Sequence, residues 1–114
     1  MTAKKNEVWL ANLDPNFGTE AGKTRPVVVL QTDALNEFHP STLICPITTN
    51  VQPKSFILRV HLPKGTAGLR ENCDIMIDQL RAIDNRRLIK KIGTIPVDVS
   101  KKIRYNIRIV LDLE

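Results

Sequence analysis

The sequence predicts a small α+β fold, mostly β, in which an antiparallel barrel or curled sheet carries a C-terminal helix. Short runs of alternating apolar and polar residues recur along most of the chain, as half-buried strands require. The last stretch changes to a helical period, with Val99, Ile103 and Ile107 on one side. Because strands follow one another instead of alternating with helices, a parallel nucleotide-binding sheet is not expected.

Length and composition are typical of one domain spanning residues 1–114. Hydrophobic residues make up 42% of the chain and charged residues 25%, as in ordinary globular proteins. The sequence contains neither an apolar run long enough to cross a bilayer nor a secretory signal, so we expect no membrane partner and a cytoplasmic location. Seventeen basic and twelve acidic residues give a net charge of +5, which favours polyanionic partners.

The first half of the chain is predicted to form strands over residues 7–13, 25–31 and 42–49. In the first strand Val8 and Trp9 face opposite sides, and we expect Trp9 in the core. The second strand is apolar enough to be covered on both faces. Pro46 cannot donate to a ladder, so the third strand should have a bulge or lie at an edge. A helical turn over 32–39 should be anchored by Leu35 and Phe38.

The second half is predicted to form strands over 56–62 and 74–83, the first of them half-exposed. Asp84 or Asn85 should cap a short helix over 86–91. The side chain of Asp98 or Ser100 should N-cap the terminal helix, and the apolar stripe of this helix should continue to Val110 and Leu111.

Several enzyme classes do not fit the sequence, because it has no Walker loop, GxGxxG, GxSxG or HExxH motif. Cys45 and Cys73 lie in apolar surroundings without ligand spacing, so we expect buried free thiols and no metal site. His39 and His61 have no nucleophile motif beside them and are interpreted as structural. Few carboxylates are clustered, which disfavours a two-metal nuclease.

Polar side chains near the predicted strand ends are the remaining candidates for chemistry: Glu20, Arg25, Thr48, Asp78 and Gln79. Arginine at a strand start suits a phosphate, because its fork offers paired donors and a fixed charge. A threonine hydroxyl can donate to a phosphoryl oxygen. These groups are compatible with metal-free phosphodiester cleavage that uses the 2′-hydroxyl of RNA as nucleophile. The alternative without a function is a solvated loop over 14–24 whose charges only add solubility.

Several motifs occur along the chain in a characteristic order. They are Asn-Leu-Asp-Pro at 12–15, Gly-Thr-Glu at 18–20, Gly22, Thr-Arg-Pro-Val-Val-Val at 24–29, Cys-Pro-Ile-Thr-Thr at 45–49, Asp-Gln-Leu-Arg-Ala-Ile-Asp at 78–84 and Arg-Leu at 87–88. In this order they resemble the MazF/PemK (Kid) endoribonuclease toxins of type II toxin–antitoxin systems. The resemblance covers essentially the whole chain.

The resemblance implies an SH3-like barrel with a C-terminal helix, shared with the gyrase poison CcdB, and a homodimer. It also implies sequence-specific cleavage of single-stranded RNA without a metal or other cofactor, leaving a 2′,3′-cyclic phosphate and a 5′-hydroxyl. A cognate antitoxin would cover the cleft with a disordered, acidic tail.

The family's site residues carry over to positions of this chain that match its motifs. Arg25 is implied as the principal catalytic residue, and Thr48 as the group that stabilises charge on the phosphorus. Phe17 would stack on a base, and Glu20 and Gln79 would contact bases. One branch of the family has a histidine where this chain has Thr19 and an arginine where it has Met76. The sequence therefore resembles the branch that uses arginine and threonine for catalysis. Thr19 and Asp78 are then implied as substrate contacts.

Another function class stays open on the sequence alone. A protein of this fold could be a non-catalytic binding module, either a gyrase inhibitor or an RNA binder. The presence of both Arg25 and Thr48 favours the enzyme, whereas a gyrase inhibitor would carry its determinants on the C-terminal helix.

Overall fold

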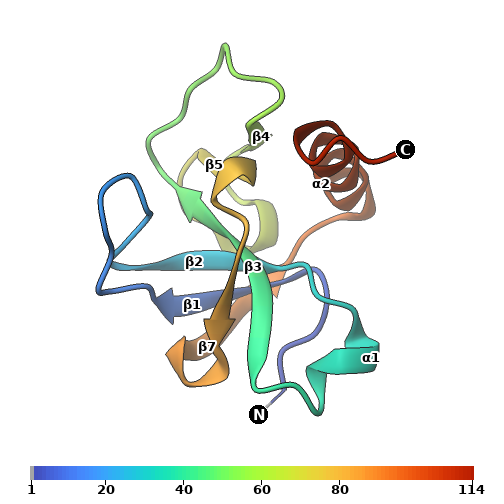
Figure 1. Ribbon diagram of the computed structural model, residues 1–114. Coiled ribbons are helices and arrows are strands. Elements are labelled where there is room, and N and C mark those ends of the chain that lie inside the picture. The colour runs from blue at the N-terminus through green and yellow to red at the C-terminus, as the bar shows by residue number, and fades with distance from the viewer. Residues whose placement is uncertain (1) are drawn as a thin grey trace.

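The computed structural model describes residues 2–114 as a strongly curled antiparallel sheet with helices beside it (Figure 1). The strands and α-helices are β1 (Glu7–Asn12), β2 (Thr24–Val29), α1 (Asp33–Asn36), β3 (Ser41–Thr48), β4 (Arg59–Leu62), β5 (Cys73–Met76), β6 (Arg81–Asp84), β7 (Leu88–Thr94) and α2 (Val97–Val110). Single 3₁₀ turns form η1 (Thr66–Gly68), η2 (Ile77–Gln79) and η3 (Asn85–Arg87). Within the described residues, no helix has both the length and the apolar character needed to cross a membrane.

Strand β3 is the centre of the sheet. The strand order is β4-β5-β3-β2-β1-β7, and β6 pairs with the first half of β3. Every pairing is antiparallel. The long connection between β3 and β4 projects from the top of the molecule, and α2 lies to one side of it (Figure 1). The predicted class, a curled antiparallel sheet with a C-terminal helix, is confirmed.

The two faces of the sheet bury separate apolar clusters, as the alternation of the first strand predicts. Val8 joins a cluster that includes Val28, Cys45 and residues of α2. Trp9 lies in the other cluster, with Ala11, Leu13 and Ile83 among its members. The expected core position of Trp9 and the coverage of β2 on both faces are therefore confirmed, since residues 27–29 are fully buried.

The strand predicted over 74–83 is wrong as a single element. The chain forms β5, bends through η2 and resumes as β6, because β3 curls and the two strands pair with different parts of it. Ile75 lies opposite Ile47, whereas Arg81 lies opposite Ile44. Pro46 falls where the partner of β3 changes. The absent N–H of this proline is tolerated there, although β3 is not an edge strand.

The helix predicted over 86–91 is also wrong. Asp84 does cap a turn, since its Oδ1 accepts a hydrogen bond from Arg86 N, but this turn is the short η3. The chain then continues as β7, which pairs with the open edge of β1. That pairing satisfies backbone groups that a solvated short helix would leave to water.

The anchors predicted for the first helical turn are wrong, because Leu35 and Phe38 are exposed. A pair of amides holds the turn instead. Gln31 Nε2 donates to Asn36 Oδ1 at 3.0 Å, and Asn36 Nδ2 donates to the Gln31 carbonyl at 3.0 Å. The strand predicted over 56–62 begins only at Arg59, and the exposed Phe56 precedes it.

Helix α2 starts without the predicted side-chain cap. Pro96 occupies the N-cap position, and Ser100 Oγ donates to Asn6 Oδ1 at 3.1 Å instead of capping. Val99 and Ile103 are buried against the sheet as predicted, whereas Val110 and Leu111 are exposed. The helix therefore packs by its first turns and leaves apolar side chains near its C-terminus in solvent.

Both cysteines are free and buried, as predicted. Burial, together with the nearby charge of Asp78, raises the pKa of the Cys45 thiol to about 12. Since the thiolate is the reactive form, Cys45 should stay unmodified when the folded protein is treated with iodoacetamide at about pH 8. Intact-mass spectrometry should show the label only after denaturation. Rapid native labelling of Cys45 would contradict this buried position.

Candidate active site

Arg25 lies at the start of β2, where the early loop over residues 14–23 enters the sheet. Its Nε donates to the carbonyl of Gly22 at 2.8 Å, and its side chain is half-buried. Neither Nη group makes a hydrogen bond or an ion pair with the described residues. The guanidinium is thus held at one nitrogen and keeps two donors for a ligand.

Gly22 is required for this close approach of the early loop. A Cβ at this position would lie 2.3 Å from Asn16 Oδ1 and 2.7 Å from Asp14 Oδ1. Asp14 Oδ1 also accepts the Lys23 N–H at 2.7 Å, so neither side chain is free to move aside without loss. The loop therefore folds tightly over its glycine and presents the Gly22 carbonyl to Arg25.

Thr48 ends β3 on the strand next to Arg25. The register between β2 and β3 pairs Val27 with Pro46 and Val29 with Ile44, and extended by two residues it sets Arg25 opposite Thr48. Thr48 Oγ1 accepts a hydrogen bond from Asn50 N at 3.1 Å. Because the oxygen is the acceptor in this bond, the hydroxyl hydrogen stays available to donate. Arg25 and Thr48 thus lie near the same end of two neighbouring strands, and their catalytic roles stay a prediction.

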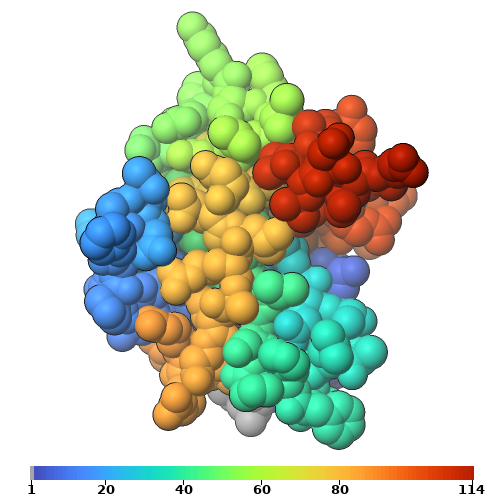
Figure 2. Space-filling model, viewed as in Figure 1, coloured from blue at the N-terminus to red at the C-terminus, as the bar shows by residue number. Residues whose placement is uncertain are grey.

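Gln79 ties the early loop to the opposite side of the site. Its Oε1 accepts the Ala21 N–H at 3.0 Å, and its Nε2 donates to the Thr19 carbonyl at 3.1 Å. The early loop (blue) accordingly lies beside the segment around η2 and β6 (yellow to orange) in Figure 2. Gln79, interpreted from the sequence as a base contact, therefore also has a structural role, and Thr19 meets it through its backbone.

Glu20 and Phe17 form the tip of the early loop. Glu20 Oε1 accepts the Phe17 N–H at 2.8 Å, and Glu20 N donates back to the Phe17 carbonyl at 3.1 Å. This reciprocal pair fixes the turn and leaves the Phe17 ring 85% exposed. A large exposed aromatic side chain on a fixed loop is suited to stacking on a base.

Asp78 lies in η2, directly before Gln79, and its carboxylate is exposed. Its charge is near enough to Cys45 to add to the rise in the pKa of that thiol. Among residues 2–114, His, Cys, Asp and Glu side chains form no group of three or more that could hold a metal ion.

Sequence reasoning missed a buried charged cluster beside Thr48. Asp74 interrupts the apolar run of β5, and it contacts Arg59 and His61 of the neighbouring strand β4. The sequence does contain a signal for this cluster, because a carboxylate inside an apolar strand requires a partner. Arg81, on β6, was also missed: its Nη1 is buried and has no hydrogen-bond partner among the described residues.

Comparison with known proteins identifies the family of this chain. A family model described as "PemK-like, MazF-like toxin of type II toxin-antitoxin system" matches residues 4–111. The chain is 32% identical over 113 residues to Endoribonuclease EndoA of Bacillus subtilis (strain 168), covering 99% of this chain and 97% of that protein.

Solved structures show the same fold. The crystal structure of MazF (Form-I) from Deinococcus radiodurans superposes with a TM-score of 0.84 at 26% identity, covering 98% of both chains. A chain of the MazE-MazF crystal structure (Form-II) from the same organism has a TM-score of 0.78 at 25% identity, covering 100% of this chain and 99% of that one. The protein therefore belongs to the PemK-like, MazF-like toxins of type II toxin–antitoxin systems.

Proposed function

We propose that the protein is a sequence-specific, metal-independent endoribonuclease that cuts single-stranded RNA and so inhibits translation and growth. The proposal is supported by the register of β2 and β3, which extended by two residues sets Arg25 across from Thr48. The Nη donors of Arg25 bind no described residue, and the Thr48 hydroxyl hydrogen is available to donate. A domain spanning residues 1–114 and a cytoplasmic location, where RNA is accessible, are parts of the same proposal.

The reaction is a transesterification within the RNA. The 2′-oxygen forms a bond to phosphorus, and the bond from phosphorus to the 5′-oxygen breaks. The 2′-hydroxyl loses one proton, and the departing 5′-oxygen gains one. The products are a 2′,3′-cyclic phosphate and a 5′-hydroxyl. Arg25 binds the phosphate and stabilises its growing charge, since a guanidinium stays protonated. Thr48 donates to a non-bridging oxygen of the same phosphate.

The early loop and η2 would hold the nucleotides beside the cut. Phe17 offers an exposed face for stacking, and Glu20 and Asp78 offer carboxylate oxygens that can accept from base amino groups. Thr19 and Gln79, joined by a hydrogen bond, set the distance between these two sides. Specificity for a short sequence would follow from this arrangement.

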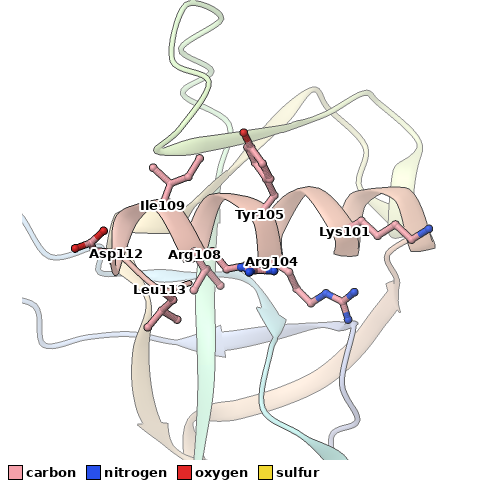
Figure 3. A pocket seen from close by; sticks show the side chains of 8 residues that line it. Lys101, Arg104, Tyr105, Arg108, Ile109, Asp112 and Leu113 are labelled. Carbon is pink, nitrogen blue, oxygen red and sulfur yellow. The ribbon is translucent and has the colours of Figure 1, made fainter.

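Two protein partners follow from the surface. The surplus of positive charge suits the acidic, disordered tail of a cognate antitoxin, which would compete with RNA for the cleft. A second copy of this chain would cover apolar side chains that α2 exposes: Tyr105, Ile109 and Leu113 project from the helix among basic residues (Figure 3). Exposed apolar groups gathered in this way are typical of an interface.

Replacing Arg25 with alanine should reduce RNA cleavage in EDTA by about 10³-fold or more, because the phosphate loses its main cationic partner. The circular dichroism melting curve should be nearly unchanged, since the Nη groups bind no described residue. Arg86→Ala is the matched control, because Arg86 is exposed and pairs only with Asp84. Intact RNA with the wild-type protein would instead favour a non-catalytic binding module.

Thr48→Ala should lower kcat by about 10²-fold, as expected when one donor to the developing charge is removed. Thr48→Ser keeps the hydroxyl and should retain most of the activity. Thr49→Ala tests the neighbouring exposed hydroxyl and should behave like the wild type. Single-turnover kinetics on a short RNA measures all three, and a wild-type rate in Thr48→Ala would remove Thr48 from the reaction.

Gln79→Ala should mainly raise KM, because the early loop loses its ties at Thr19 and Ala21. Hydrogen exchange at the Ala21 amide should quicken in the same variant. Glu37→Ala is a suitable control, since Glu37 is exposed and its side chain makes no hydrogen bond or ion pair with the described residues. Unchanged exchange at Ala21 would show that the loop is held by other contacts.

A further inference from the structure

Asp74 is a fully buried carboxylate with an unusual set of donors. Its Oδ2 accepts the Gln52 N–H at 2.8 Å and Arg59 Nη1 at 3.1 Å, and its Oδ1 lies 2.6 Å from His61 Nδ1. Burial acts to raise the pKa of Asp74, but the hydrogen bonds from Gln52, His61 and Arg59 outweigh it and lower this pKa below its ordinary value. Asp74 therefore stays charged and needs its partners.

This carboxylate is next to the proposed catalytic threonine. The register between β3 and β5 pairs Thr48 directly with Asp74, and the register between β4 and β5 pairs Asp74 with His61. Residues paired across antiparallel strands project from the same face of the sheet. Asp74 and His61 therefore continue, strand by strand, the row that begins with Arg25 and Thr48.

The same cluster holds the chain that follows Thr48. Arg59 Nη1 donates to the Asn50 carbonyl at 3.0 Å, and Asp74 takes the N–H of Gln52. Asn50 N in turn donates to Thr48 Oγ1. Asp74 and Arg59 thus hold two points of the segment over 50–55. The first residue of this segment is hydrogen-bonded to the Thr48 hydroxyl oxygen.

A negative charge beside a phosphate site would repel the phosphate unless it is neutralised. Arg59 is well placed to neutralise it, because its side chain is 12% exposed and its guanidinium touches both Asp74 and the Asn50 carbonyl. A buried ion pair that served stability alone would not need to lie across from Thr48 or to bind the loop that follows it.

We propose that Asp74 and Arg59 are positioning residues for RNA. Asp74 fixes the segment over 50–55 beside Thr48, and Arg59 cancels the charge of Asp74 so that a phosphate of the RNA strand is accepted there. The inference rests on the proposed ribonuclease function and deepens it, because it adds the segment over 50–55 to the residues that would hold the RNA strand. Neither residue touches the reacting atoms.

The test compares Arg59→Met, Asp74→Asn and the double variant on the same RNA at one fixed pH. Arg59→Met removes the guanidinium that neutralises the buried carboxylate. The kcat/KM for RNA should fall about 100-fold, mainly through KM, since the phosphate is repelled in substrate and transition state alike. The double variant should have a kcat/KM at least about tenfold higher than that of Arg59→Met, because Asp74→Asn removes the repelling charge.

The exposed pair Arg86–Asp84 provides matched controls of the same residue types. Arg86→Met, Asp84→Asn and their double variant should all cleave like the wild type. All variants are compared below their melting temperatures, so that loss of folding is not counted as loss of activity. Trypsin cleavage after Lys54, which is exposed in the held segment, should quicken in Arg59→Met.

The outcomes separate the two proposals. If the wild type cleaves RNA and Arg59→Met cleaves equally well, or if the double variant is no better than Arg59→Met, the positioning role is wrong. If the wild type does not cleave RNA, the proposed function is wrong, and the role in RNA positioning fails with it. In that case a change in trypsin cleavage at Lys54 would show only a structural tether.

Discussion

The antiparallel pairing of β2 with β3 is the constraint on which the rest of the structure depends. Val27, Val28 and Val29 are fully buried, and each lies opposite a buried residue of β3. A shift of this register by one residue would turn every side chain of β2 to the other face of the sheet. Extended by two residues, the same register would set Arg25 opposite Thr48. The packing of the core therefore also fixes the proposed catalytic pair.

Around this pair, charge is arranged asymmetrically. On one side the early loop leaves the Nη groups of Arg25 free, and Gln79 holds that loop in place. On the other side Asp74 is buried, but Arg59 and His61 surround its carboxylate. In the proposed mechanism a phosphate would meet an unpaired guanidinium on one side and a carboxylate neutralised by Arg59 on the other. This difference in charge would favour an anion, because partly buried charges are screened less than charges in water.

Much of the fold could be predicted from the sequence, because alternation is a direct consequence of strand geometry. It placed Val8 and Trp9 on opposite faces and identified the buried strand at residues 27–29. The bend at η2 could not be predicted, because residues 74–83 contain neither a glycine nor a proline to mark a break in the strand. That bend comes from the curl of β3, a tertiary property that no local pattern records.

The site shows a similar division. Residue types near strand ends, together with the family resemblance, pointed to Arg25 and Thr48, which lie on neighbouring strands β2 and β3. The tethering by Gln79 could not be predicted, because it depends on two segments far apart in the chain. Asp74 was missed although it interrupts an apolar strand, because its partners Arg59 and His61 become neighbours only when β4 and β5 pair.

The most direct test of the central claim is cleavage of an RNA oligonucleotide whose scissile nucleotide carries a single 2′-deoxy substitution. In the proposed mechanism Arg25 and Thr48 stabilise a phosphate attacked by the RNA's own 2′-oxygen. The all-ribose strand should therefore be cut in EDTA to a fragment with a 5′-hydroxyl. The substituted strand should bind but stay intact. Cleavage of the substituted strand at the same position would contradict the account, because the nucleophile would then have to be water or a group of the protein.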